Sequence, residues 1–186
     1  MPRLNMFNNI SLDGYFTDAS NDMSWAHAGA DDPELREFTA GNAKGAAALI
    51  FGRVTYQMMA NFWPTPQAAA AMPDVAKGMN QARKYVFSHS LQKTDWANTT
   101  ILSGDPVSEI TRMKQENGPQ MTLLGSGSIA RQLAAAGLID DYQLLVCPVI
   151  LGGGRTLFEG VKGRPTLKLA NSRTFQNGRV FLHYTA

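Results

Sequence analysis

The sequence predicts an α/β fold, with a mainly parallel β-sheet, an antiparallel edge and helices on both faces. Short apolar segments that suit buried strands alternate with segments of helical pattern along most of the chain. Three of these strands are followed directly by a helix, the unit from which parallel sheets are built. The C-terminal part differs, because two strand-like segments flank Asn177-Gly178, a dipeptide typical of hairpin turns.

Size and charge fit a single soluble domain that spans residues 1–186. Hydrophobic residues make up 44% of the chain and charged residues 17%, which allows a sizeable core. The 17 basic and 15 acidic residues give a formal net charge of +2. No basic run carries interleaved aromatic residues, so the sequence argues against nucleic-acid binding.

The sequence favours a cytoplasmic location. The single cysteine, Cys147, lies in an apolar run, where we expect a buried structural thiol in a reducing compartment. The N-terminal residues lack the apolar core and cleavage site of a signal peptide. No apolar stretch approaches the length of a membrane span, so we expect no membrane association.

The first third of the chain predicts two strands and two helices. Residues 3–9 form the first strand. Asp32 is placed to cap a helix that Pro33 begins, because proline suits the first helical position. Residues 47–52 are a short apolar run that ends in glycine, as a buried strand would, and residues 53–60 follow with a helical pattern.

The middle of the chain predicts a surface connection and two strands. Residues 63–82 contain three prolines and an alanine cluster, which predicts a connection with a short helix. Residues 84–88 and 99–102 are β-branched and aromatic runs that predict the next two strands.

The next helix carries the same start signal as the first. Asp105 is the expected cap and Pro106 the first helical residue, and residues 117–118 (Asn-Gly) are a plausible end. Residues 121–124 then predict a further strand.

The last third predicts a helix, a long strand and a hairpin. The helix covers residues 126–136 and Gly137 closes it. The strand covers residues 141–151, and the hairpin pairs residues 167–175 with residues 179–184. The Gly-Gly-Gly-Arg segment that follows the long strand opens no helix, so we interpret it as a structural loop.

The turn Gly125-Ser126-Gly127-Ser128 follows a strand and opens a helix. In open α/β sheets ligands bind beyond the carboxyl ends of the strands, which is where this turn lies. Glycines allow close backbone approach, and a helix start favours an anion. Ala130 stands where a full dinucleotide motif has its third glycine, so the turn is either a phosphate cradle or a tight corner.

Two other strand ends have similar chemistry. Gly52 ends one strand, and Arg53 follows in a helical first turn, where a cation is unfavourable unless an anion binds beside it. Ser88 and His89 follow the next strand and suit a phosphate ester. The alternatives are an exposed arginine and a polar loop start. Taken together, three anion-compatible strand ends favour a ligand with several phosphates, such as a dinucleotide.

Five motifs carry a family resemblance. They are "SLDGYF", "FGRVTYQMM", "KYVFSHSL", "LLGSGSIARQL" and "GLIDDYQLLVCPVILGGGRTLFEG", in this order along nearly the whole chain. The chain resembles the dihydrofolate reductase-like superfamily and is most similar to the C-terminal reductase domain of bifunctional riboflavin biosynthesis proteins. The resemblance implies a three-layer αβα sandwich and NADPH as the cofactor.

The resemblance also implies roles for particular residues. Arg53 would lie near the adenosine 2′-phosphate, the turn after Leu124 under the pyrophosphate, and Phe16 and Thr17 in a mobile loop over the nicotinamide. The full set of expected cofactor-binding residues is Phe16, Gly52, Arg53, Val54, Thr55, Ser88, His89, Leu124, Gly125, Ser126, Gly127, Ser128 and Ile129.

Two carboxylates are the expected catalytic residues, because reduction by hydride also requires a proton. Asp13 would lie near the substrate, by resemblance to the riboflavin branch. Glu34 falls where dihydrofolate reductases place the acid that anchors the pterin, although a glutamate in a first turn also suits the helix dipole.

The expected function is therefore NADPH-dependent hydride transfer to a small heterocyclic or imine-type substrate, similar to 5-amino-6-(5-phosphoribosylamino)uracil reductase. Dihydrofolate reductase activity proper and a non-catalytic NADPH-binding module remain alternatives. The chain lacks the His-x-Glu and Pro-Cys-x-x-Cys zinc signature of nucleobase deaminases, and we expect no metal site. By resemblance we expect a homodimer, for which the C-terminal hairpin offers an edge.

Overall fold

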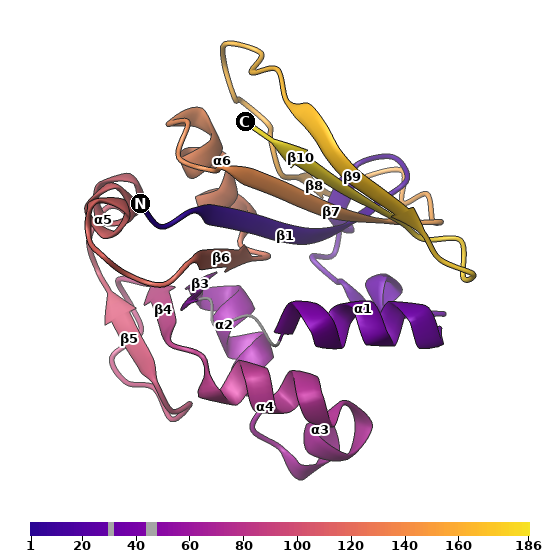
Figure 1. Ribbon diagram of the computed structural model, residues 1–186, viewed down its shortest axis with the longest axis horizontal. Coiled ribbons are helices and arrows are strands. Elements are labelled where there is room, and N and C mark those ends of the chain that lie inside the picture. Colours follow the sequence, from indigo (N-terminus) through magenta and orange to yellow (C-terminus); the bar gives the residue numbers. More distant parts are fainter. Residues whose placement is uncertain (30–31, 44–47) are drawn as a thin grey trace.

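The computed structural model describes residues 1–29, 32–43 and 48–186. Within these ranges the chain forms an eight-stranded sheet in the order β5-β4-β3-β6-β1-β7-β10-β9 (Figure 1). The strands are β1 (Leu4–Ser11), β3 (Ala48–Gly52), β4 (Lys84–Phe87), β5 (Thr99–Leu102), β6 (Met121–Leu124), β7 (Asp141–Cys147), β9 (Lys168–Thr174) and β10 (Val180–Thr185).

The sheet is mostly parallel, as predicted. β1 lies at its centre and pairs in parallel with β6 and β7, and β3, β4 and β5 continue the parallel part. β10 and β9 add the antiparallel edge as a hairpin. Because β3, β4 and β6 run in the same direction, their carboxyl ends meet at one edge of the sheet.

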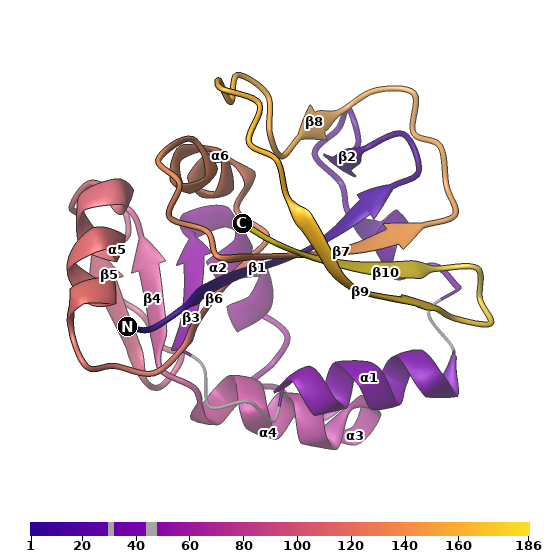
Figure 2. The same ribbon diagram turned by 45° about the horizontal axis from the view of Figure 1, so that its top comes forward.

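Helices cover both faces, which confirms the three-layer prediction. α5 and α6 lie on one face, and α1, α3 and α4 on the other (Figure 2). The helices are α1 (Pro33–Ala43), α2 (Arg53–Ala60), α3 (Pro66–Ala71), α4 (Pro73–Gln81), α5 (Pro106–Gln115) and α6 (Gly127–Ala135), with a 3₁₀ turn at Ser24–Ala26.

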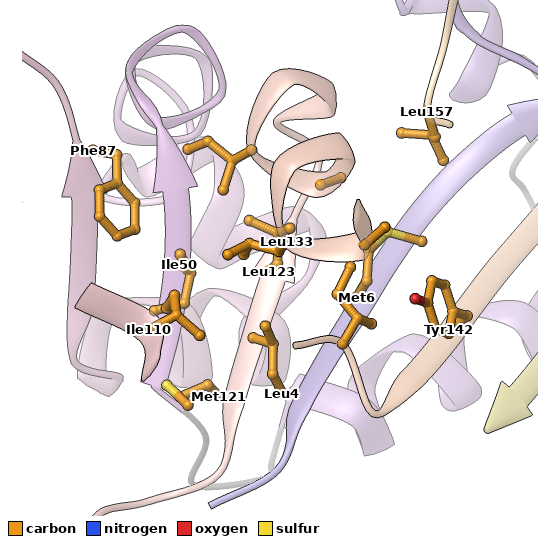
Figure 3. Packing of buried hydrophobic residues seen from close by; sticks show 14 of the residues in the cluster. Leu4, Met6, Ile50, Phe87, Ile110, Met121, Leu123, Leu133, Tyr142 and Leu157 are labelled. Carbon is orange, nitrogen blue, oxygen red and sulfur yellow. The ribbon is translucent and has the colours of Figure 1, made fainter. Parts of the chain in front are cut away.

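Alternation along the strands divides the core between the two faces. Leu4 and Met6 of β1 are fully buried and pack with Leu123 of β6 against Ile110 of α5 and Leu133 of α6 (Figure 3). The intervening side chains of β1 point to the opposite face. That face packs on α1, α2 and α4 and contains the cavity described below.

The predicted caps form as expected. The Asp32 carboxylate accepts hydrogen bonds from the amides of Glu34 and Leu35, at 2.9 and 3.1 Å, and α1 begins there. The Asp105 carboxylate accepts one from the amide of Ser108 at 2.9 Å and begins α5. Each cap satisfies an amide that the first helical turn otherwise leaves without a partner.

Three element predictions need correction. The connection over residues 63–82 holds two helices, because Thr65 caps α3 and Pro73 begins α4. α5 ends at Gln115, ahead of the Asn-Gly pair. β7 ends at Cys147, since Pro148 has no amide to donate and the amide of Val149 turns back to the Cys147 carbonyl.

The C-terminal hairpin forms, but its turn is longer than two residues. The amide of Gly178 donates to the Phe175 carbonyl at 3.0 Å, and the amide of Phe175 donates to the Arg179 carbonyl. Gly178 has a φ of +81°, which glycine adopts without strain. β9 is exposed along its whole length at the sheet edge, and the homodimer stays a prediction.

A second, small sheet fastens the N-terminal loop to the Gly-Gly-Gly-Arg segment. β2 (Tyr15–Thr17) pairs with β8 (Arg155–Thr156) in antiparallel fashion. Gly154 packs so closely that a Cβ there would lie 2.0 Å from the Thr17 carbonyl oxygen. This packing supports the interpretation of the segment as a structural loop.

Candidate functional site

Two spaces adjoin at the carboxyl edge of the sheet. The large cleft, of about 810 Å³, is lined by the loops that follow β3, β4 and β6 and by β2. The neutral cavity, of about 270 Å³, lies between the sheet and helices α1, α2 and α4. Met23, Thr55 and Met58 line both spaces, so molecules bound in the two would be neighbours.

The structure brings the three anion-compatible strand ends together in the large cleft. Of the expected cofactor-binding residues, Leu124 and Gly125 line the neutral cavity and Thr55 lines both spaces. The remaining residues line the large cleft alone, and they are Phe16, Gly52, Arg53, Val54, Ser88, His89, Ser126, Gly127, Ser128 and Ile129.

Two hydroxyl groups brace the loops after β3 and β6 against each other. The amide of Ser126 donates to the Thr55 hydroxyl at 3.1 Å, and the amide of Gly52 donates to the Ser126 hydroxyl at 2.6 Å. Ser126 adopts a left-handed conformation with φ 59°, which turns the chain into α6. These hydroxyls therefore fix the starts of α2 and α6 side by side.

Both helices begin without a capping side chain. Gly52 precedes α2 and has no side chain, and Ser126 precedes α6 but its hydroxyl accepts no bond from the first turn. The amide of Arg53 continues the β3–β4 pairing, which ends at Gly52 and Phe87. Within the described parts of the chain, the amides of Val54, Gly127 and Ser128 donate to no loop, turn or side-chain acceptor. Free amides at a helix start attract anions, because the helix dipole adds to their partial positive charge.

Glycine is required in the turn before α6 on steric grounds. A Cβ on Gly127 would lie 2.3 Å from the ring of Phe16, which is buried beneath the turn. Gly125 has a φ of +56°, and a Cβ there would lie 2.9 Å from the Thr55 side chain. The two glycines therefore let the Phe16 ring and the Thr55 side chain pack directly against the backbone of the turn.

Ionisable side chains line the large cleft. Arg53 and His89 were expected there, and Arg155 joins them from β8, with its guanidinium 5.8 Å from the centre of the Phe16 ring. Sequence reasoning missed Arg155, since only the pairing of β2 with β8 carries it to the cleft. Asp105 also lines the cleft, but its carboxylate is already bonded to the amide and hydroxyl of Ser108.

The carboxylate of Asp13 fastens two loops. It accepts bonds from the Ser11 hydroxyl at 2.6 Å and from the amides of Gly152 and Leu151 at 2.8 and 3.1 Å. The bond from Ser11, followed by those from the two amides, lowers the pKa of Asp13 to about 2. Asp13 lines neither space, and a carboxyl group with this pKa is ionised near neutral pH.

Glu34 also lies apart from both spaces. Its side chain is exposed on α1, and its Oε2 lies 3.7 Å from the guanidinium of Arg173 on β9. The structure therefore does not bring the two expected catalytic carboxylates together with the strand-end loops. Their assignment as proton donors stays a prediction.

The neutral cavity has a polar floor and an apolar wall. Asn5 of β1, Thr122 of β6 and Gln143 of β7 contribute amides and a hydroxyl from three adjacent strands. The wall is formed by Met58, Met59, Trp63, Val75 and Met79, from α2, α4 and the connection between them. Every described residue that lines this cavity is uncharged. Sequence reasoning did not assign it, because its residues come from separate elements and form no local motif.

The sequence model of the family described as the RibD C-terminal domain matches residues 2–181. The chain belongs to this family. The match covers nearly the whole chain, and it confirms the resemblance to the C-terminal domain of riboflavin biosynthesis proteins.

Similar proteins and solved structures also match nearly the whole chain. YyaP of Bacillus subtilis (strain 168) is 28% identical over 176 residues, covering 94% of this chain and 90% of YyaP. A structure from Shewanella sp. PV-4, whose name refers to riboflavin biosynthesis, matches with a TM-score of 0.77 and 19% identity. The match covers 100% of this chain and 98% of the Shewanella chain.

A third comparison is with a bifunctional enzyme. It is the diaminohydroxyphosphoribosylaminopyrimidine deaminase/5-amino-6-(5-phosphoribosylamino)uracil reductase of Thermotoga maritima, at TM-score 0.69 and 18% identity. The match covers 99% of this chain but 56% of the Thermotoga chain. At these identities the structural likeness shows a common fold.

Two further observations apply to the described residues alone. None of their helices is long and apolar enough to cross a membrane. Among the same residues, no group of three or more histidine, cysteine, aspartate or glutamate side chains is placed to hold a metal ion.

Proposed function

We propose that this chain is an NADPH-dependent reductase that acts on a small heterocyclic or imine-type substrate. The observation that carries the proposal is the pair of braced, uncapped helix starts that open on the large cleft beside the neutral cavity. When bound, NADPH would supply a hydride for the substrate carbon, and the substrate nitrogen would take a proton.

The residues of the large cleft fit this cofactor. The amides of Gly127 and Ser128 suit the pyrophosphate, because they lie at the start of α6, where the helix dipole favours an anion. The amide of Val54 at the start of α2 and the exposed guanidinium of Arg53 suit a further phosphate. Val54 is 70% exposed in the cleft, which provides apolar area for a ring to cover.

The neutral cavity favours a reductase over a non-catalytic nucleotide-binding module. A module that binds only a nucleotide has no use for a second space that shares Met23, Thr55 and Met58 with the first. Folate reduction gains no support, because Glu34 lies outside both spaces. As no described residue of the cavity is ionisable, we propose that water delivers the proton.

Titration calorimetry with NADPH and NADH tests the proposal. We expect Arg53→Ala to weaken NADPH binding about 10- to 100-fold, because a charge-assisted hydrogen bond contributes about 1.5–3 kcal/mol. NADH lacks the additional phosphate, so its affinity should stay within about twofold.

Arg112→Ala is the matched control for that experiment. It removes the same charge from the exposed side of α5, where Arg112 pairs with Glu109 and Glu116. Its NADPH affinity should equal that of the wild type. If the wild type binds neither nucleotide, the proposed function is wrong.

A further inference from the structure

We infer that Thr17 of β2 and Arg155 of β8 bind the pyrophosphate of the nucleotide, together with the amides at the start of α6. The inference rests on the proposed function, because it requires a nucleotide in the large cleft. It assigns a phosphate-binding role to the small β2–β8 sheet, whereas the family resemblance implies only that Thr17 lies in a loop over the nicotinamide.

The pairing of β2 with β8 brings the two residues together (Figure 2). Thr17 lies directly opposite Arg155 in this antiparallel pair, so their side chains share one face of the small sheet. The register shifts between Tyr15 and Thr17, which makes Phe16 the extra residue of a bulge. Phe16, Thr17 and Arg155 all line the large cleft. The small sheet therefore presents three neighbouring side chains to the cleft.

The Thr17 hydroxyl is the first argument. Only 6% of Thr17 is exposed, and its Oγ1 atom is buried with no hydrogen-bond partner among the described residues. Buried hydroxyls are normally hydrogen-bonded, because the loss of their bonds to water is otherwise uncompensated. Since Thr17 lines the cleft, a ligand there can supply the missing partner. A hydroxyl donates readily to a phosphate oxygen.

The charge of Arg155 is the second argument. Arg155 is exposed, and within the described parts of the chain its guanidinium forms no ion pair. The guanidinium lies over the Phe16 ring, 5.8 Å from the ring centre. Stacking on a ring leaves the N–H donors at the edge of the guanidinium free, and their planar fork matches two phosphate oxygens.

The Phe16 ring connects these side chains to the start of α6. A Cβ on Gly127, the first residue of α6, would lie 2.3 Å from this ring, and Arg155 lies over the same ring. A pyrophosphate has oxygens on two phosphorus atoms. One phosphate can therefore accept from the amides of Gly127 and Ser128 while the other pairs with Arg155. The anion would also offset the cost of a cation near a helix start.

Titration calorimetry with NADPH and NADH separates the role of Arg155 from that of Arg53. Both nucleotides carry the pyrophosphate, so Arg155→Ala should weaken both about tenfold or more, whereas Arg53→Ala should weaken NADPH alone. Arg155→Lys keeps the charge without the planar fork and should lose less affinity than the alanine variant. Lys162→Ala is the control, because Lys162 is exposed in the segment after β8 and lines neither space. Its affinities should equal those of the wild type.

Thr17→Val tests the hydroxyl with two measurements that should move in different directions. Valine removes a buried hydroxyl that has no protein partner, so the Tm of the nucleotide-free variant should equal or exceed that of the wild type. Its affinity for both nucleotides should nevertheless fall about three- to tenfold, the effect of one lost hydrogen bond. A purely structural role would lower Tm as well. Thr156→Val makes the same change on β8 outside the cleft and should leave both affinities unchanged.

ADP-ribose separates the inference from the proposed function, because it carries the pyrophosphate without the nicotinamide or the additional phosphate. If the wild type binds NADPH and either variant, Arg155→Ala or Thr17→Val, binds it equally well, the assignment of that residue is wrong while the proposed function stands. ADP-ribose binding that depends on Arg155, in a wild type that binds neither NADPH nor NADH, would leave the pyrophosphate site assigned and the reductase proposal wrong. Absence of binding of all three compounds would overturn both.

Discussion

The large cleft and the neutral cavity adjoin, yet different parts of the polypeptide build them. Backbone forms much of the cleft: two uncapped helix starts, a left-handed serine and glycines that admit no Cβ. Side chains from the sheet floor and the facing helices form the cavity. The difference suggests a division of labour, in which backbone amides hold an anionic group common to many reactions and replaceable side chains select the substrate.

The largest expected effect comes from filling the backbone turn of the cleft. Gly127→Val places a side chain against the Phe16 ring, where even a Cβ would lie at 2.3 Å, and pushes the start of α6 out of position. We expect NADPH affinity to fall by about 100-fold or more, since several amide contacts are lost together. Calorimetry measures the loss.

Gly118→Ala is the control for that variant. A Cβ at Gly118 would meet only Pro2, at 4.0 Å, and the residue has no positive φ. Its NADPH affinity should match the wild type. Circular dichroism must show that Gly127→Val is folded, and a folded variant with unchanged affinity would refute the amide cradle.

The difference between a cleft built of backbone and a cavity built of side chains also explains which site residues the sequence could predict. The Gly125-Ser126-Gly127-Ser128 turn and the Gly52-Arg53 helix start are contiguous in the chain, and their local chemistry predicted an anion site. The parallel order of the strands then predicted that they meet. Asn5, Thr122 and Gln143 lie far apart in the sequence, and only the register of β1 with β6 and β7 places them together.

Arg155 and Asp13 show why local sequence patterns could not predict the rest of the candidate site. Arg155 reaches the cleft through the pairing of β2 with β8, two strands of three and two residues that carry little sequence signal. Asp13 is of a residue type that can act as a catalytic acid. The amides that donate hydrogen bonds to it belong to Leu151 and Gly152, which lie in a loop distant in the sequence. A carboxylate that is fully bonded cannot be told from a free one without those partners.

A second, smaller effect is expected from Lys84, which supports the wall of the neutral cavity. Lys84 is fully buried, and its ammonium donates to the carbonyls of Met79, Asn80 and Ala82 at 2.9, 3.2 and 2.7 Å. These bonds hold the end of α4, which supplies Val75 and Met79 to the cavity wall. Lys84→Met leaves three carbonyls without their donor and should destabilise the protein by about 3 kcal/mol.

Thermal unfolding measures this prediction. A loss of that size lowers Tm by about 6–12 °C in a domain of this length. Lys77→Met makes the same change at an exposed position of the same helix and should leave Tm nearly unchanged. In folded Lys84→Met the affinity for NADPH should match that of the wild type, because Lys84 lines neither space. A marked loss of NADPH affinity would mean that the two spaces do not behave as separate units.

The smallest effect is expected at Asp13, which lies outside both spaces. Its pKa of about 2 is below the ordinary value of 3.8, so its ionised form stabilises the folded protein above pH 3.8, and this contribution is lost as the pH falls towards 2. Asp13→Asn should therefore have a lower Tm than the wild type at pH 5, and the difference should shrink as the pH falls through this range.

Glu34→Gln supplies the contrast for Asp13, because an exposed pair at 3.7 Å contributes little to stability. The Tm of Glu34→Gln should follow that of the wild type at every pH, and both carboxylate variants should retain wild-type affinity for NADPH. A general acid contributes about 10²- to 10⁴-fold to turnover. If turnover falls by that factor in either variant while binding is unchanged, that carboxylate is the proton donor. Such a result would contradict proton delivery by water.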